Sequence, residues 1–491
     1  MFNFSNNQRA HKDSLASLDD NVPLKRTRSS WIRSSSLGNN ASLAKASEDD
    51  AARQLRRHKF SLLQSVFALS EEDITSNRWP GARTYLKYVC EQLEDLYCGD
   101  EHPVLTLLGH VGPADLVHLL KFVTVVANVL RTSGKDGASI SEVFDNVLEE
   151  FGIDPDSDAI SSNVRHAGQE FVFAIIGWLT MLYKPVKPKP NDPGFYLHVN
   201  EKQVGVKAHL ANEVAKRPIA GLLRALGNIL PHVDQRLGQD TSHVHDQRSV
   251  LIQISALNFY ALKTIAKINI QWVDCLSAHL EFHPLSRTLL LFRFPSFCAL
   301  NCKEKEDGLC FNRVLDEYYH EAKSANKSSL VLATYKREVI LSYRLLFGQT
   351  QRSRKLFASQ ESKVASGEDN KFSDPLLERL CHQRASELRT LPNELWPHSC
   401  RDPNGNLLEQ DVYSIETDFP VFGQRMLTLQ AFSLRQSPSR IKDMWRDRRN
   451  PVQWLTLWAV LLVGGISLLL QVIQIILSSA QLALQLQQSG V

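Results

Sequence analysis

Residues Trp454–Leu477 read WLTLWAVLLVGGISLLLQVIQIIL and contain no charged side chain. At a rise of about 1.5 Å per residue, a helix over this stretch is about 36 Å long, whereas the hydrocarbon core of a bilayer is only ~30 Å thick. The stretch therefore predicts one membrane-spanning helix over residues 454–477, followed by a short tail over residues 478–491. A lipid bilayer is the first partner that the sequence predicts.

The residues before the apolar stretch are basic and aromatic. Six Lys and Arg residues lie between Arg435 and Arg449, and residues 451–491 carry no charge. Positive charge favours the cytosolic side of a membrane, and indole rings favour the headgroup region. We expect a basic juxtamembrane segment over residues 437–453, a cytosolic N-terminus and a single span of the tail-anchored type, with a neutral tail that favours the endoplasmic reticulum. The predicted membrane-interface residues are Trp445, Arg446, Arg448, Arg449, Trp454 and Trp458.

Small and polar residues recur along the predicted span at alternating spacings of three and four. The stripe comprises Gly464, Ser467, Gln471, Gln474, Ser478 and Gln481, and it continues through Gln485 and Gln488. This heptad spacing places the residues on one face of a helix. One interpretation is a homo-oligomer held by glutamine side chains that pair across helices in lipid. The other is a weak anchor whose last turns lie in the interface, with the glutamines facing water.

The distribution of charge and cysteine bears on the class of protein. The chain has 491 residues and a net charge of +3, but residues 61–434 alone carry −6. An acidic body argues against nucleic acid as a partner, because phosphate binding needs a basic face. Eight cysteines without a secretory signal predict reduced thiols in the cytosol. No phosphate-binding loop, nucleophile elbow, zinc-protease motif or dinucleotide-binding motif occurs, so we predict no catalytic residue and no cofactor.

Residues 1–50 are rich in serine, asparagine and charge, and they predict a disordered basic tail. The segment Lys25–Arg33 places basic residues ahead of serines, a pattern that suits basophilic kinases. The predicted phosphorylation sites are Ser29, Ser30 and Ser36. The alternatives are a solvated tail or a contact with the membrane surface.

The remaining residues predict a mainly α protein with a few short strands. Ser139 and Glu142 form a capping-box pattern before a helix, and Asp374 precedes Pro375 as a second helix start. Glu170–Tyr183 is apolar but too short to cross a bilayer, so it predicts a core helix. Residues Tyr335–Phe357 predict one long helix. The expected organisation is a helical domain over 51–232, a linker over 233–248, a second helical domain with short strands over 249–358, a linker over 359–373 and a helical segment over 374–436.

Two segments share an order that suggests a duplication. Ile176–Leu179 precedes an expected strand at Phe195, and Ile270–Val273, expected within a helix, precedes a strand at Leu289. The two segments are either a duplicated helix–strand unit or two winged-helix-like modules. The alternative is a chance similarity, because few positions match.

Two groups of Cys and His residues are candidate metal ligands. Cys298, Cys302, Cys310 and His320 could form a zinc site, although the spacing matches no paired CxxC knuckle. His243 and His245 lack a third ligand placed by spacing. Buried free cysteines are the favoured reading, so no metal ligand is assigned.

Three motifs resemble a group of uncharacterised filamentous-fungal proteins. They are FRFPSFC at Phe292–Cys298, YRLLFGQ at Tyr343–Gln349 and WRDRRNPVQWLTLWAVLLVGG at Trp445–Gly465. The resemblance covers the last 250 residues or so, and it implies a helical cytosolic body with one C-terminal hydrophobic span. It implies no activity. The sequence thus favours a membrane-anchored, non-enzymatic interaction protein with a cytosolic protein partner. The alternatives are a membrane-tethered nucleic-acid-binding regulator and, third, an enzyme with an unrecognised site.

Overall fold

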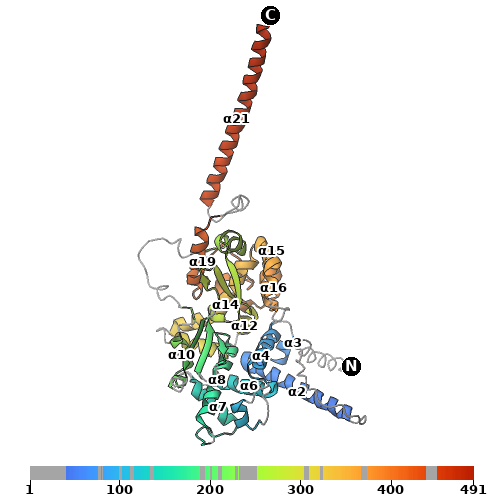
Figure 1. Cartoon of the computed structure of the whole chain (residues 1–491), viewed down its shortest axis with the longest axis vertical. Coiled ribbons are helices and arrows are strands. Elements are labelled where there is room, and N and C mark those ends of the chain that lie inside the picture. Colours follow the sequence, from blue (N-terminus) through green and yellow to red (C-terminus); the bar gives the residue numbers. More distant parts are fainter. Residues whose placement is uncertain are drawn as a thin grey trace.

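The computed structural model of the chain describes residues 40–75, 79, 81–98, 102–110, 115–132, 138–158, 160–187, 194–199, 202–207, 213–226, 230–231, 251–302, 309–320, 325–365, 373–437 and 451–490. It confirms a mainly α fold with short strands and one long apolar C-terminal helix. Figure 1 shows a helical body from which helix α21 projects.

Helices make up most of the body and all of the C-terminal projection. The α-helices of the N-terminal half are α2 (Asn40–Phe67), α3 (Glu71–Thr75), α4 (Ala82–Leu96), α5 (Pro103–Leu107), α6 (Leu116–Thr132), α7 (Ile140–Glu150), α8 (Ser162–Thr180) and α10 (Ile219–Ala225). The later α-helices are α11 (Ile254–Leu257), α12 (Pro295–Leu300), α13 (Cys310–His320), α14 (Ala325–Tyr343), α15 (Gln351–Gln360), α16 (Ser362–Ala365), α17 (Pro375–His382), α18 (Ile415–Asp418), α19 (Gly423–Arg435) and α21 (Pro451–Ser489).

Short π- and 3-10 helices link these elements. The π-helices are η2 (Ala261–Ile265) and η4 (Arg344–Gly348). The 3-10 helices are η3 (Leu276–Ala278), η6 (Ala385–Thr390), η7 (Asn393–Leu395) and η8 (His398–Cys400).

The described strands form three small sheets. One is an antiparallel sheet of order β1-β2-β3, with strands Lys184–Val186, Gly194–Val199 and Lys202–Lys207. A second pairs β4 (Leu251–Gln253) with β8 (Val412–Ser414) in antiparallel fashion. The third has the order β5-β7-β6, with β5 (Asn269–Val273) parallel to β7 (Thr288–Phe292) and β6 (Phe282–His283) antiparallel to β7.

Several local expectations are confirmed by the backbone. Ser139 caps α7 in a capping box, because its hydroxyl accepts from the Glu142 amide and the Glu142 carboxylate accepts from the Ser139 amide. The Asp374 carboxylate caps α17 by accepting from the amides of Leu376 and Leu377. The core helix expected at Glu170–Tyr183 is α8, which begins eight residues earlier behind the Ser161 cap.

A single hydrophobic core connects both ends of the body. The main cluster of buried residues runs from Leu62 to Leu429, across both expected domains. The rings of Phe67 and Tyr85 lie 4.8 Å apart, and Tyr85 stacks 5.7 Å from Phe297 of α12. The N-terminal helices and the later elements are therefore packed as one unit, whereas the predicted linker over residues 233–248 lies outside the described residues.

Four expectations about where elements lie and where they end differ from the structure, and a fifth, about the helix expected over residues 335–357, is taken up with the site below. Ile270–Val273 lies in strand β5 rather than in a helix, so the proposed helix–strand duplication is wrong for its second copy. The N-terminal helix begins at Asn40, inside the tail expected to be disordered. The predicted linker over residues 359–373 is helical in part, at Ser362–Ala365. Helix α21 continues to Ser489, so most of the segment expected as a tail is helical.

Candidate functional site

The C-terminal helix α21 is the first candidate site. It contains an apolar stretch over Leu455–Gln485, 31 residues long, with a mean hydropathy of 2.5 in its most apolar window. This is the one helix, within the described part of the chain, that is long and apolar enough to cross a membrane. Almost all its described side chains are exposed, so the body does not bury this helix as a core element.

The predicted membrane-interface residues divide between described and undescribed segments. Trp454 and Trp458 lie in the first turns of α21, and the Trp458 side chain is 37% exposed. Trp445, Arg446, Arg448 and Arg449 lie outside the described residues, as do the predicted phosphorylation sites Ser29, Ser30 and Ser36.

The predicted stripe residues all lie on α21, and its continuous helix preserves their common face. Gly464, Ser467, Gln471, Gln474, Ser478 and Gln481 are exposed. The Ser467 hydroxyl donates to the Val463 carbonyl at 2.9 Å, so this polar group is satisfied within its own helix. The amides of Gln471 and Gln474 have no hydrogen-bond partner within the part of the chain that the structure describes.

The cysteines form no metal site in the described residues. All eight are free, seven are buried, and no group of three or more described His, Cys, Asp or Glu residues could hold a metal ion. The Cys310 thiol donates to the Ala127 carbonyl at 3.2 Å, and burial raises its pKa to about 12. A buried thiol that stays protonated at neutral pH is a poor nucleophile and a poor metal ligand. The side chain of His320 and both His243 and His245 lie outside the description.

Buried ionisable groups are the next candidates, because displaced pKa values are common at catalytic sites. Three such groups lie along α14 and η4, which we call the central helix: Lys336, Glu338 and Arg344, each with no exposed surface. Burial raises the pKa of Glu338 to about 8. Each group nevertheless has backbone partners, and these partners explain why it is buried.

The first two charges of the central helix bind the ends of neighbouring helices. The Lys336 ammonium donates to the carbonyl of Asn301, the C-cap of α12, at 2.5 Å. The Glu338 carboxylate accepts from the amides of Val421 and Phe422 at 3.0 and 2.8 Å, and Phe422 is the N-cap of α19. The Lys336 cation at a helix C-terminus complements the helix dipole, and the carboxyl oxygens of Glu338 satisfy amides at a helix N-terminus that lack partners within the helix.

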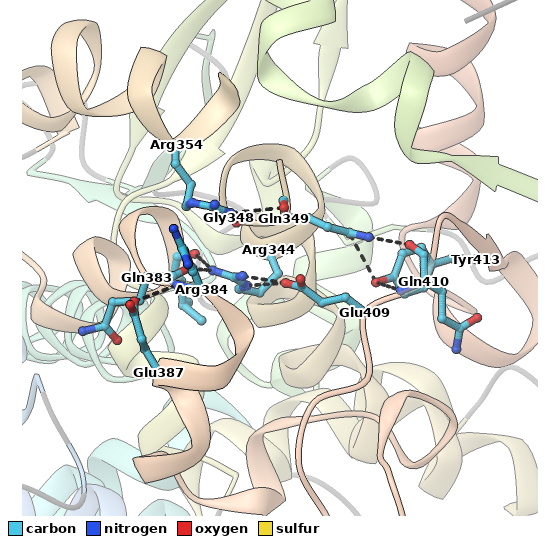
Figure 2. A network of polar contacts seen from close by, with 11 residues as sticks. Arg344, Gly348, Gln349, Arg354, Gln383, Arg384, Glu387, Glu409, Gln410 and Tyr413 are labelled. Atoms are coloured by element: carbon cyan, nitrogen blue, oxygen red, sulfur yellow. Dashed lines mark hydrogen bonds and ion pairs between the residues drawn. The ribbon is translucent and has the colours of Figure 1, made fainter. Parts of the chain in front are cut away.

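The third charge, Arg344, ends the regular part of the central helix. Figure 2 shows its guanidinium between the C-terminus of α17 and Glu409. It donates to the carbonyls of Leu380 and Gln383 at 2.5 and 2.7 Å and to the Glu409 carboxylate at 2.5 Å. A Cβ atom on Gly348 would lie 2.2 Å from both Arg344 Nη1 and the Leu380 carbonyl, so only glycine leaves room for this contact.

This network also explains a break in an expected helix. The sequence predicts one helix from Tyr335 to Phe357, but the structure has α14, the π-helix η4 and then α15 behind the Thr350 cap. Single π-helical turns inside α-helices often occur where a side chain has a specific role. Here the π-helical turn begins at Arg344. The network thus holds together the fold around α14, and it presents no reactive group to solvent.

Sequence reasoning missed one pair of charged residues at the body surface. Arg293 Nε lies 2.6 Å from Asp274 Oδ1, and the two side chains are only 18% and 16% exposed. Asp274 directly follows β5 and Arg293 directly follows β7. The sequence does contain a signal for this pair, because a charged residue follows each of the two apolar segments that form β5 and β7. The first segment was expected to be helical, so the two charges were not placed together.

Comparisons with known proteins give no family. No protein-family model matches the chain, no characterised protein matches it in sequence, and no solved structure matches it. The resemblance to filamentous-fungal proteins therefore stays a prediction.

Substitution of Gly348 tests the network around Arg344. We expect Gly348→Ala to lower the free energy of unfolding by roughly 1–3 kcal/mol, because overpacking displaces the guanidinium from the Leu380 carbonyl. Gly221→Ala in α10 is the matched control, since a Cβ there meets no atom within 4 Å. Denaturant unfolding of the solubilised chain measures both. Equal stability of the two variants would contradict the assigned role of Gly348.

The raised pKa of Glu338 predicts a pH dependence of stability. The pKa of the Glu338 carboxyl group is about 8 in the folded chain and 4.5 in the unfolded chain. Its contribution to the stability of the fold is therefore largest at low pH and is lost as the pH rises through 8. Glu338→Gln should therefore show a smaller fall in melting temperature between pH 6 and pH 8 than the original chain.

The matched control for Glu338→Gln is Glu149→Gln, on the exposed face of α7. This control should keep the pH dependence of the original chain. If Glu338→Gln loses as much stability between pH 6 and pH 8 as the original, Glu338 is already ionised at the lower pH and the prediction is wrong.

Proposed function

We propose that α21 anchors this chain in a membrane and that its helical body binds a protein partner on the cytosolic side. The distribution of exposed apolar residues carries this proposal: eighteen of the twenty-four large exposed apolar residues of the described chain lie on α21. An apolar surface of this extent needs either lipid or a protein partner. Lipid fits better, because the apolar residues cover most of the helix circumference outside the polar stripe rather than forming one narrow stripe themselves.

The orientation in the proposal comes from the charges that flank the helix. Six Lys and Arg residues precede it between Arg435 and Arg449, and residues 451–491 have none. By the positive-inside rule, the body lies on the cytosolic side. The tail-anchored topology and the endoplasmic reticulum remain part of the proposal.

A binding function is favoured over nucleic-acid recognition and over catalysis. The winged-helix reading required a helix at Trp272, and that residue lies in strand β5. The buried ionisable groups of the central helix are engaged by backbone amides and carbonyls, which supports a structural role for them.

The anchor is tested by placing charge inside it. We expect Ile466→Arg combined with Leu470→Arg to move the chain from the membrane pellet to the supernatant, because each arginine near the middle of a span costs about 2.5–3.5 kcal/mol. Deletion of residues 454–491 should have the same effect, and alkaline carbonate should not extract the original chain. Fractionation followed by immunoblotting measures all three.

The matched control is Leu408→Arg, an exposed leucine of the body that is 49% exposed. This variant should stay in the pellet. Extraction of the original chain by carbonate would contradict a span. Protease added to sealed vesicles should digest the body, and protection of the body would reverse the proposed orientation.

The position of the stripe along α21 divides it into two parts. With Trp458 at one interface, Gln471 and Gln474 lie about 20 and 24 Å further along the helix, within a hydrocarbon core of ~30 Å. Ser478 and Gln481 lie about 30 and 35 Å along, at the opposite interface. We propose that Gln471 and Gln474 pair across two copies of the span, because a primary amide in lipid lacks water as a partner.

Removal of the two amides tests this self-association. Gln471→Leu with Gln474→Leu should weaken dimerisation about tenfold, since each interhelical hydrogen bond in lipid contributes roughly 0.5–2 kcal/mol. Leu470→Ala with Ile473→Ala, which lies off the stripe, should weaken it less. A transmembrane-association reporter carrying residues 454–491 measures both. Undiminished association of the glutamine variant would favour the interfacial reading of the stripe.

A further inference from the structure

The sheet β5-β7-β6 packs on the main core mainly with one of its faces, and of the other face only Phe292, at the end of β7, reaches the main cluster. Trp272 and Leu291 alternate toward the core, where they belong to the main cluster. Gln271 and Leu290 are register partners on the other face. That face has its own small apolar cluster, separate from the main one, formed by Val273, Cys275, Ala278 and Leu290.

Two adjoining cavities lie along this second face, and together we call them the sheet cleft. One has a volume of about 280 Å³ and lies against the apolar cluster. The other has a volume of about 460 Å³ and lies beside the turn between β6 and β7, which carries Pro284 and the fully exposed Leu285. Gln271 and Leu290 line both cavities, so the cleft is continuous along the two strands.

Charged residues gather at one end of the sheet cleft. Asp274 and Arg293 line the smaller cavity directly behind β5 and β7, whose last residues are paired in parallel register. The carboxyl ends of adjacent parallel strands are a common position for ligand sites. Because Arg293 Nε lies 2.6 Å from Asp274 Oδ1, the guanidinium is held at the cavity wall.

Strands β1 and β2 also contribute to the wall of the smaller cavity. Lys184 and His198 are register partners in that antiparallel pair, so their side chains leave the sheet on the same face. Within the described residues, the Lys184 ammonium has no carboxylate partner. The amide of Leu276 donates to the Met181 carbonyl at 2.7 Å, and the Cys275 thiol donates to the Leu182 carbonyl at 2.9 Å. These contacts fix the two parts of the wall relative to each other.

The charge of the smaller cavity selects the class of ligand. Among the described Lys, Arg, Asp and Glu residues that line this cavity, Lys184 and Arg293 exceed Asp274 by one positive charge. One carboxylate balances that charge, whereas a phosphate monoester brings about −1.5 to −2. The volume of about 280 Å³ lies just below the ~300–1,000 Å³ range of drug-sized sites, so it suits a small metabolite.

We propose that the sheet cleft binds a small monocarboxylate with a short apolar chain. The carboxylate binds Lys184 and Arg293 at the charged end. The chain lies over Val273 and Leu290 and extends toward the turn at Leu285. This proposal concerns the body alone and does not depend on the membrane anchor.

The probe is hexanoate, titrated calorimetrically into the full chain in lipid nanodiscs, with the heat of empty nanodiscs subtracted. Hexanoate should bind at least about tenfold more tightly than hexanol, which lacks the charge, because hydrogen bonds between charged groups are stronger than those between neutral groups. Acetate, which lacks the chain, should also bind more weakly. No hexanoate binding, equal binding of hexanol, or tighter binding of hexyl phosphate would each overturn the proposal.

Variants of Lys184 locate the binding within the chain. Lys184→Gln should weaken hexanoate binding about tenfold or more, and Lys184→Arg should restore it, because the charge returns at the same place. Lys216→Gln, at an exposed position outside the cleft, is the matched control and should bind as the original does. Melting temperatures verify that each variant is folded. Unchanged affinity of folded Lys184→Gln would overturn the proposal.

Discussion

The fold depends on three ionisable side chains of the central helix that bind the ends of other helices. Lys336, Glu338 and Arg344 are buried completely, and burial of a polar or charged group without hydrogen-bond partners is unfavourable. Each one is stabilised by backbone groups that themselves lack partners: the end of α12, the start of α19 and the end of α17. Because neither side of such a contact is satisfied without the other, the central helix fixes where these three helices begin and end.

The position of α19 matters most for the relation between the body and the anchor. In addition to the contact between Glu338 and the start of α19, the Arg425 side chain of α19 donates to the carbonyls of Ser277 and His279. Gln430 accepts from the Gln253 amide and donates to the Leu251 carbonyl. Helix α19 is thus fixed at both ends before the chain continues toward α21 (Figure 1).

His279 is a buried titratable residue that links β7 to the central helix. Burial, with a contribution from Arg425, holds its pKa well below the usual range, so the ring is neutral. One ring nitrogen accepts from the Phe292 amide, and the other contacts the Ser342 hydroxyl of the central helix. The same end of β7 leads to Arg293 and the sheet cleft. The central helix therefore also supports the strand that carries the cleft.

Local sequence determined the parts of this protein that depend on neighbouring residues alone. An uncharged stretch such as Trp454–Leu477 is apolar in any context, and a cap such as Ser139 or Asp374 binds amides two or three residues away. Tertiary structure decided the rest. Ile270–Val273 is a strand because β7 pairs with it, and Arg344 starts a π-turn because α17 and Glu409 accept its hydrogen bonds. Asp274 and Arg293 meet only through that parallel pairing, so no local pattern could place them together.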